Sequence, residues 1–260
     1  MRNHKKLNPI MKTVLITGAT SGIGMATALK FSKGDFRLIL TGRNVERLDE
    51  LKRQISSQGT SCVTLQFDVR SFDQVRQAFG LLPPDWAQVD ILINNAGLAL
   101  GLEPVADGDP DDWNTMIDTN IKGLLYVTRF CLPSMLKRRH GHIINIGSVA
   151  GDAAYAGGGV YCATKAAVKT LSDALRIDLM KTPIRVTNIK PGLVETNFSV
   201  TRFHGDRQRA ADVYKGIKPL TGDDIAEVIY FAACAPEHVQ IAEVLVLATH
   251  QANGSLTYRE

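Results

Sequence analysis

A short β-branched run followed at once by a glycine-rich turn stands near the start of the chain. Residues 13–17 read Thr-Val-Leu-Ile-Thr, which is typical of a strand buried on both faces. Residues 18–24 read Gly-Ala-Thr-Ser-Gly-Ile-Gly, and a helical pattern begins at Met25. Strand, glycine turn and helix in this order present backbone N–H groups and a helix N-terminus to a phosphate group. The spacing G-x-x-x-G-x-G differs from the commonest dinucleotide fingerprint, so its place between strand and helix carries the prediction.

The alternation of strand and helix patterns continues along the chain. Strands are expected at 13–17, 36–41, 62–67, 89–94, 142–147, 184–189 and 244–247, with helices at 25–31, 45–57, 71–79, 111–139, 161–180 and 221–234. Pro133 should kink or end the fourth of these helices. This order predicts an α/β fold of the Rossmann type, a doubly wound parallel sheet of about seven strands with helices on both faces. We expect one dinucleotide-binding catalytic domain over 12–260, a substrate flap with one short helix at 193–215, and an extension at 1–11.

Composition and charge exclude several other classes of protein. The 45% apolar and 22% charged fractions are typical of a soluble globular chain. No apolar run reaches the ~18 residues of a membrane span, and the N-terminus lacks the apolar region of a secretory signal. The net charge of +4 is modest and forms no basic nucleic-acid module. Four scattered cysteines indicate a reduced, cytoplasmic protein, and His140 and His142 have no third ligand nearby, so no metal site is expected.

A phenol and an ammonium group stand one helical turn apart at Tyr161 and Lys165. A free phenol, with a pKa of ~10, is a poor base at neutral pH. A nearby cation favours the phenolate and lowers that pKa. The pair is therefore suited to moving a proton onto or off an alcohol oxygen. Alternatively, the two residues form a surface pair.

The segment after the second strand bears on the choice of cofactor. An NAD site is expected to carry an acidic residue ~20 residues past the glycine turn. Arg43 and Asn44 stand there instead, and a guanidinium can hold a 2′-phosphate. The sequence therefore favours NADP, unless Arg43 is a solvated loop residue. Asp68 could bind an adenine amino group or cap the next helix, for which Ser71 competes.

Five motifs in one order resemble the short-chain dehydrogenase/reductase family over about residues 12–250. They are TGATSGIG at 17–24, NNAG at 94–97, Asn120, Ser148 and YCATK at 161–165. The resemblance implies that Tyr161 is the general acid/base and that Lys165 lowers its pKa and holds the nicotinamide ribose. It also implies that Ser148 bonds the reacting oxygen and that Asn120 holds a water in a proton relay.

The same resemblance implies an NADP site built from the glycine turn and from the ends of the following strands. Its residues would be Gly18, Thr20, Ser21, Gly22, Ile23, Gly24, Arg43, Asn44, Asp68, Val69, Asn95, Ala96, Gly97, Tyr161, Lys165, Pro191, Gly192, Val194 and Thr196. In the NADP-dependent 3-hydroxy acid dehydrogenase branch of the family, a second arginine is frequent at the position of Asn44, and this departure could weaken the preference for NADP.

Several longer segments are similar to the NADP-dependent 3-hydroxy acid dehydrogenase branch of that family. They include NNAGLALGLEP at 94–104, YAGGGVY at 155–161, PGLVETNF at 191–198 and TRFHGD at 201–206. That branch acts on serine, allo-threonine and related short 3-hydroxy acids, and reduces malonic semialdehyde. Arg202 could then clamp a substrate carboxylate, Glu103 could receive an ammonium group, and Tyr155 could wall the pocket. Solvated loop charges, and packing for Tyr155, are the competing interpretations.

Two other functions stay open at this stage. A carbonyl or 3-oxoacyl reductase would share the fold and the catalytic residues and would differ in the loops. A cofactor-sensing regulator would bind NADP without turnover, although it would have no chemical need for Ser148, Tyr161 and Lys165 together. The resemblance further implies a homotetramer, because helices 111–137 and 160–180 build a four-helix interface in that family.

Overall fold

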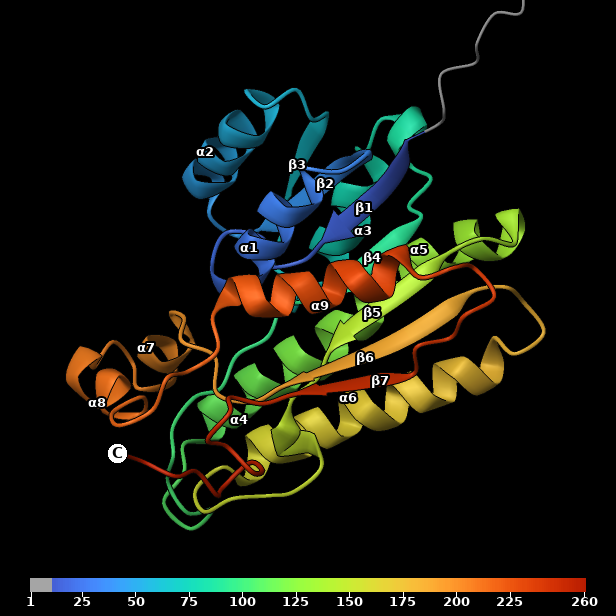
Figure 1. The fold of residues 1–260 in the computed structure, drawn as a ribbon. Helices are drawn as coiled ribbons and strands as arrows, with labels where there is room; N and C mark the ends of the chain where they lie inside the picture. The colour runs from blue at the N-terminus through green and yellow to red at the C-terminus, as the bar shows by residue number, and fades with distance from the viewer. Residues whose placement is uncertain (1–10) are drawn as a thin grey trace, which may run out of the picture.

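Seven parallel strands form one sheet in the computed structural model, which describes residues 11–260 (Figure 1). The order across the sheet is β3-β2-β1-β4-β5-β6-β7. The strands are β1 (Lys12–Ile16), β2 (Phe36–Gly42), β3 (Cys62–Gln66), β4 (Ile91–Asn94), β5 (His142–Ile146), β6 (Arg185–Pro191) and β7 (Glu243–Val246). The order reverses between β1 and β4, which creates a crevice at the carboxyl ends of the strands. The predicted fold class is confirmed; apart from Met11, the expected extension lies outside the described residues.

Helices cover both faces of the sheet (Figure 1). One face carries α1 (Gly22–Phe31), α2 (Val45–Ser56) and α9 (Gly222–Cys234), and the other carries α3 (Phe72–Gly80), α5 (Leu124–Arg138) and α6 (Gly159–Asp178). Alternate residues of each strand enter different cores: Val14 and Ile16 pack under α1 and α9, whereas Leu15 packs under α5. All three side chains are fully buried, which is the pattern expected of central parallel strands.

A π-helical turn divides the helix expected over 111–139 into two helices. The two helices are α4 (Pro110–Ile117) and α5, and the turn between them spans Asp118–Gly123. Pro133 lies inside α5 and does not end it, since the helix continues to Arg138. The ring of Pro133 is exposed and stays clear of the sheet. The π turn, rather than the proline, is therefore the irregular part of this segment.

The flap at 193–215 contains two short helices rather than one, α7 (Phe198–Arg202) and α8 (Arg207–Asp212). The C-terminal tail returns to the same end of the sheet as α7 and α8 (Figure 1). There the Glu260 N–H donates to the Gly216 carbonyl at 2.9 Å. The tail thus holds the chain directly after the flap.

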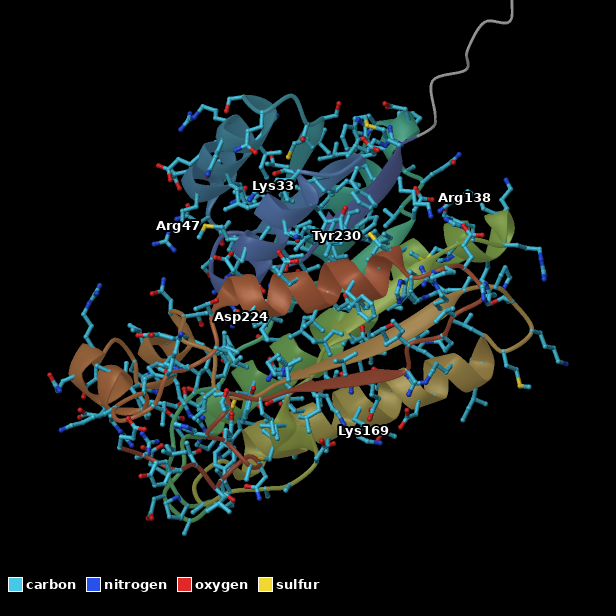
Figure 2. The ribbon with its side chains drawn as sticks, viewed as in Figure 1. Lys33, Arg47, Arg138, Lys169, Asp224 and Tyr230 are labelled. Atoms are coloured by element: carbon cyan, nitrogen blue, oxygen red, sulfur yellow. The ribbon has the colours of Figure 1, made fainter. Side chains whose placement is uncertain are left out.

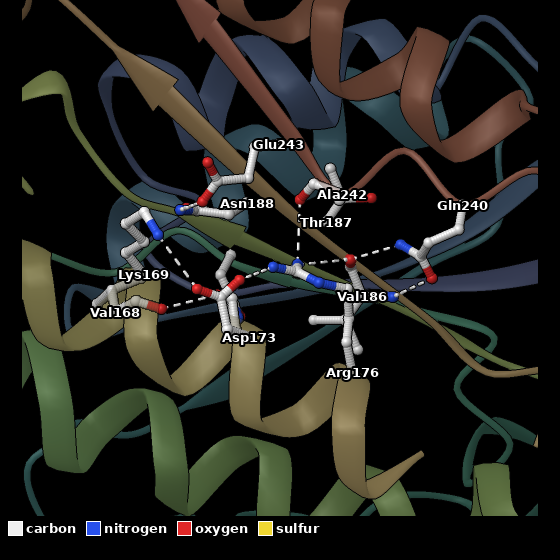
Figure 3. Close-up of polar contacts among 12 residues, drawn as sticks. Val168, Lys169, Asp173, Arg176, Val186, Thr187, Asn188, Gln240, Ala242 and Glu243 are labelled. Carbon is white, nitrogen blue, oxygen red and sulfur yellow. Dashed lines mark hydrogen bonds and ion pairs between the residues drawn. The ribbon is translucent and has the colours of Figure 1, made fainter. Parts of the chain in front are cut away.

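A polar network fastens α6 to the edge of the sheet (Figure 3). Asp173 pairs with Lys169 at 3.2 Å and with Arg176 on the same helix. The Arg176 guanidinium donates to the carbonyls of Val186 at 3.2 Å and Ala242 at 3.1 Å. These contacts fix the axial position of the helix that carries residues 161 and 165.

Charged side chains lie on the outside of the helices, as Arg47, Lys169 and Asp224 do in Figure 2. Within residues 11–260, no helix combines the length and apolar character needed to cross a membrane. In the same part of the chain, no cluster of three or more His, Cys, Asp or Glu side chains could hold a metal ion. Cys62, Cys131, Cys162 and Cys234 are free thiols.

Candidate active site

A cavity of about 480 Å³ lies at the carboxyl ends of the strands, between the glycine turn and the flap. This volume is in the range of small-molecule and cofactor sites. Most residues expected at the site line it, namely Gly18, Thr20, Ser21, Gly22, Ile23, Arg43, Asp68, Val69, Asn95, Ala96, Gly97, Ser148, Tyr155, Tyr161, Lys165, Pro191, Gly192, Val194, Thr196 and Arg202. Gly24, Asn44, Glu103 and Asn120 are not part of its wall.

The glycine turn brings backbone close to the loop after β4. Gly18 has φ +65°, and a Cβ there would lie 3.0 Å from the Ala96 Cα. A Cβ on Gly24 would lie 2.3 Å from the Gly18 carbonyl oxygen, so only glycine permits α1 to begin this near to β1. The N-cap residue, Ser21, makes no side-chain cap, which leaves N–H groups of the first turn available to an anion. The turn therefore fits a pyrophosphate group.

The rim of the cavity near β2 and β3 is charged. Burial opposes the charge of Asp68, but two bonds from the Arg70 guanidinium, at 2.9 and 2.6 Å, and the Arg43 charge lower its pKa. Ser71, not Asp68, caps α3. Arg43 is 65% exposed with its Nη1 3.9 Å from Asp68. An exposed guanidinium at this rim is compatible with a 2′-phosphate.

Asn44 has a structural role that the sequence did not indicate. Its Oδ1 accepts from the Arg47 N–H at 2.8 Å and so caps α2. The side chain is thereby directed to the helix end and away from the cavity wall. The expectation that Asn44 contacts the cofactor is not supported by this geometry.

Ser148, Tyr161 and Lys165 all line the cavity, and Ser148 is hydrogen-bonded to Tyr161. Ser148 follows β5; its Oγ accepts from the Ala150 N–H at 3.1 Å. Tyr161 and Lys165 lie in the first two turns of α6, where Lys165 Nζ is 5.9 Å from the centre of the phenol ring. The ammonium donates to the Ile146 carbonyl at 2.9 Å. The three side chains predicted to carry the chemistry are thus brought together.

The pKa of the phenol does not follow the expectation. Burial raises the pKa of Tyr161 well above its ordinary value, and Ser148 and Arg202 lower it only in part. Burial also lowers the pKa of Lys165 to about 8. Because both groups are buried, removal from water outweighs the attraction that Lys165 was expected to exert on the phenolate.

Asn120 lies in the π turn, behind the cavity wall. Its Nδ2 donates to the Leu98 carbonyl at 2.8 Å and to Thr164 Oγ1 at 3.0 Å, and its Oδ1 accepts from the Leu98 N–H at 2.9 Å. A Cβ on Gly97 would approach both Asn120 Oδ1, at 3.2 Å, and Lys165 Nζ, at 3.4 Å. The amide therefore joins the loop after β4 to α6, beside the ammonium group.

Arg202 enters the cavity from the flap. Its Nε donates to the Gly101 carbonyl at 3.0 Å and its Nη1 to the Tyr155 hydroxyl at 2.9 Å. The guanidinium lies 5.3 Å from the Tyr155 ring centre and 5.6 Å from that of Tyr161. Its Nη2 is buried and has no hydrogen-bond partner among residues 11–260. Buried donors are normally paired, so this nitrogen is suited to an anionic ligand.

Glu103 does not face the large cavity. Its carboxylate accepts from the Leu102 N–H at 2.7 Å and lies 3.6 Å from the Arg209 guanidinium. It lines a small neighbouring hollow instead. The expectation that it receives a substrate ammonium group is therefore not supported, because its oxygens already face the Leu102 N–H and Arg209 and Glu103 is not part of the cavity wall.

Several wall residues were not expected from the sequence. Gln251, from the C-terminal tail, accepts from the Leu193 N–H at 2.9 Å and lies against Gly192. Phe198 packs edge-on against the Tyr161 ring at 5.6 Å. No motif marks Gln251, and Phe198 ends the PGLVETNF segment without a role expected for it. Their place depends on how the tail and the flap return to the sheet.

The chain is similar to proteins of known activity. The model of the short chain dehydrogenase family matches residues 12–207. An "NADP-dependent 3-hydroxy acid dehydrogenase" of Schizosaccharomyces pombe is 45% identical over 251 residues, which is 96% of this chain and 97% of that protein. The YdfG enzyme of the same description from Escherichia coli K12 is 46% identical, over 94% and 97% of the two chains.

The structure agrees with these likenesses. A solved structure described as the closed form of serine dehydrogenase complexed with NADP+ has a TM-score of 0.90 and 45% identity, covering 95% of this chain and 99% of its own. The fold of the chain is therefore that of these similar proteins. The chain belongs to the short-chain dehydrogenase family.

Proposed function

We propose that this protein is an NADP-dependent oxidoreductase that moves a hydride between NADP(H) and a short 3-hydroxy acid or its semialdehyde. One observation carries the substrate class: Arg202 lines the same cavity as Tyr161, and its buried Nη2 has no partner among residues 11–260. A cation with a free donor beside a proton-transfer group suits a small substrate that carries a carboxylate. The names of the similar enzymes agree with this reading.

NADP, when bound, supplies or accepts the hydride. The uncapped first turn of α1 and the glycine turn would hold the pyrophosphate, and Arg43 would hold the 2′-phosphate. Thr41 Oγ1 is buried without a hydrogen-bond partner in the described chain and adjoins this part of the wall. These features fit a phosphorylated dinucleotide better than an uncharged ligand.

In reduction, the Tyr161 hydroxyl gives its proton to the carbonyl oxygen of the substrate, while the Ser148 hydroxyl bonds the same oxygen. A phenol with its ordinary pKa of ~10 is protonated at neutral pH, which is the form that this step requires. Lys165 holds positive charge beside the phenolate that forms. Arg202 orients the substrate through its carboxylate, and Tyr155 fixes the guanidinium. In oxidation the same groups act in reverse.

Steady-state kinetics of Tyr161→Phe and Arg202→Gln test the proposal, with 3-hydroxypropionate and malonic semialdehyde as substrates. Removing a positioned acid/base group should lower kcat by about 10²–10⁴-fold, because proton transfer contributes that much. Arg202→Gln should raise KM for the acid and leave KM for NADP unchanged. If Tyr161→Phe retains the wild-type turnover, the acid/base role of Tyr161 is wrong. If Arg202→Gln retains the wild-type KM for the acid, the carboxylate-binding role of Arg202 is wrong.

Arg43→Ala tests the cofactor separately. Losing a guanidinium that bonds a 2′-phosphate should raise KM for NADPH by about tenfold, while KM for NADH stays the same. Equal effects on both cofactors would exclude a phosphate contact.

We further propose a cytoplasmic homotetramer, a dimer of dimers. Leu125 on α5 is 39% exposed and Ile177 on α6 is 68% exposed, and four free cysteines suit a reducing compartment. Light scattering in solution should give about four times the chain mass of 28.4 kDa.

A further inference from the structure

The flap is joined to the segment before α4 by a pair of contacts at Arg202. The Gly101 N–H donates to the Arg202 carbonyl at 2.9 Å, and the Arg202 Nε donates back to the Gly101 carbonyl at 3.0 Å. The direction of the guanidinium therefore depends on how the end of α7 sits against this segment. Any further contact that fixes this end also fixes the guanidinium.

His204 supplies such a contact. Its Nε2 lies 3.0 Å from the Oδ2 of Asp112, in the first turn of α4. The Asp112 side chain is 15% exposed and that of His204 is 61% exposed. The helix N-terminus favours the charged carboxylate. His204 has φ +50° and Gly205 φ +96°, so a non-glycine residue adopts the left-handed region where the chain turns back toward α4.

We infer that His204 and Asp112 position Arg202, and that they make the affinity for carboxylate substrates depend on pH. The inference rests on the proposed function, in which Arg202 binds the substrate carboxylate. With a cationic imidazole the two residues form an ion pair that holds the end of α7 against α4. With a neutral imidazole the contact is a weaker hydrogen bond, and Arg202 is less well held.

The other charged groups of these elements are carboxylates, guanidinium groups and one ammonium group. They are Asp109 and Asp111 at the start of α4, Glu103 and Asp107 in the loop before it, and Glu195, Arg202, Asp206, Arg207, Arg209, Asp212 and Lys215 in the flap. Carboxylates and guanidinium groups keep their charge between about pH 6 and 8. Lys165, whose pKa burial lowers to about 8, changes charge at the upper end of this range. Its effect is common to every variant below and cancels when they are compared.

The experiment measures KM for 3-hydroxypropionate and for its uncharged amide from about pH 5.5 to 8, with saturating NADP. In the wild type, KM for the acid should rise up to about fivefold, since a half-exposed ion pair contributes no more than this. His204→Lys keeps the cation at every pH, so KM should stay low and flat. Asp112→Asn and His204→Gln should give a high, flat KM. In all three variants kcat, KM for NADP and KM for the amide should match the wild type.

Arg207→Gln is the matched control, because it removes one exposed flap cation at the start of α8. It should keep the wild-type profile. If Asp112→Asn and His204→Gln also keep that profile while Arg202→Gln raises KM for the acid, the positioning role is overturned and the carboxylate clamp stands. If Arg202→Gln leaves KM unchanged, the proposed function itself fails. Should Asp112→Asn fold poorly by circular dichroism, a flat profile in His204→Lys still supports the inference, and a wild-type profile overturns it.

Discussion

Lys165 carries its charge at a position that is only 6% exposed. Its ammonium group donates to one carbonyl, that of Ile146, and burial lowers its pKa from 10.5 to about 8. At neutral pH this shift corresponds to roughly 3 kcal/mol of destabilisation of the charged form. The buried charge of Lys165 therefore lowers the stability of the fold, as is common for charged groups at functional sites.

Lys165→Met should be more stable than the wild type at pH 7 by about 1–3 kcal/mol, and should lose most of its turnover. Because the folded-state pKa is below the unfolded one, the folded chain binds fewer protons between about pH 8 and 10.5. The destabilisation caused by the buried Lys165 charge is complete below pH 8 and disappears as the pH rises from about 8 to 10.5. Urea unfolding at pH 7 and pH 9.5 should show the advantage of the variant shrinking. Lys169→Met, at a half-exposed site on the same helix, should show no increase in the free energy of unfolding over the wild type.

At the residue scale, the sequence predicted those side chains whose place follows from strand ends and helix spacing. Ser148, Tyr161 and Lys165 are of this kind, because the end of β5 and the start of α6 face one crevice. Asn44 and Glu103 are different, since each is a polar loop residue with several possible partners. The hydrogen bonds to the N–H groups of Arg47 and Leu102 decide where they point, and no periodicity encodes these.

At the scale of elements, the helix between β4 and β5 shows what an apolar pattern cannot encode. The period of the pattern is continuous, yet the π turn at Asp118–Gly123 interrupts the backbone ladder. The bonds of Asn120 to Leu98 and Thr164 account for the irregular turn, because they require the amide to reach two other segments. Such turns occur mostly at functional sites, which agrees with its place beside Lys165.

The C-terminal tail and the flap form one unit in the structure. The Arg259 guanidinium donates to the carbonyls of Lys215 at 2.6 Å and Val213 at 3.1 Å, next to the bond between Glu260 and Gly216. Removing residues 259–260 should free the end of the flap, which has few other polar anchors than Tyr214.

The truncated chain should therefore show a severalfold higher KM for the substrate acid and faster cleavage within 193–215 in limited proteolysis. Its melting temperature should change little, because the tail buries little of the sheet core. Arg47→Ala, which alters an exposed arginine on α2, is the control and should behave as the wild type. An unchanged KM and cleavage rate would show that the tail does not restrain the flap.

At the scale of the molecule, the alternating pattern predicted the seven strands but not their order in the sheet. Local sequence determines that Val14 and Leu15 lie in a buried strand; it does not determine that β4 pairs with β1. That pairing depends on crossovers that pass to opposite faces, which is a property of the assembled chain. The same limit explains why the flap was expected to hold one helix and has two.

Acid should destabilise the whole fold through His142. This side chain is 2% exposed at the start of β5, with Nε2 2.8 Å from Thr187 Oγ1 and with Nδ1 unpaired among residues 11–260. Burial, and then the charges of Arg185 and Lys12, lower its pKa from 6.5 to about 3. Below pH 6.5, His142 therefore binds a proton in the unfolded chain but not in the folded chain. The free energy of unfolding consequently falls as the pH falls from 6.5 toward 3. The loss should be about 2 kcal/mol by pH 5.

Urea unfolding at pH 7.5 and pH 5 should show this loss in the wild type and in His238→Gln, whose parent side chain is exposed. In His142→Gln the loss should be smaller by that amount; an equal loss would assign the acid sensitivity to another group.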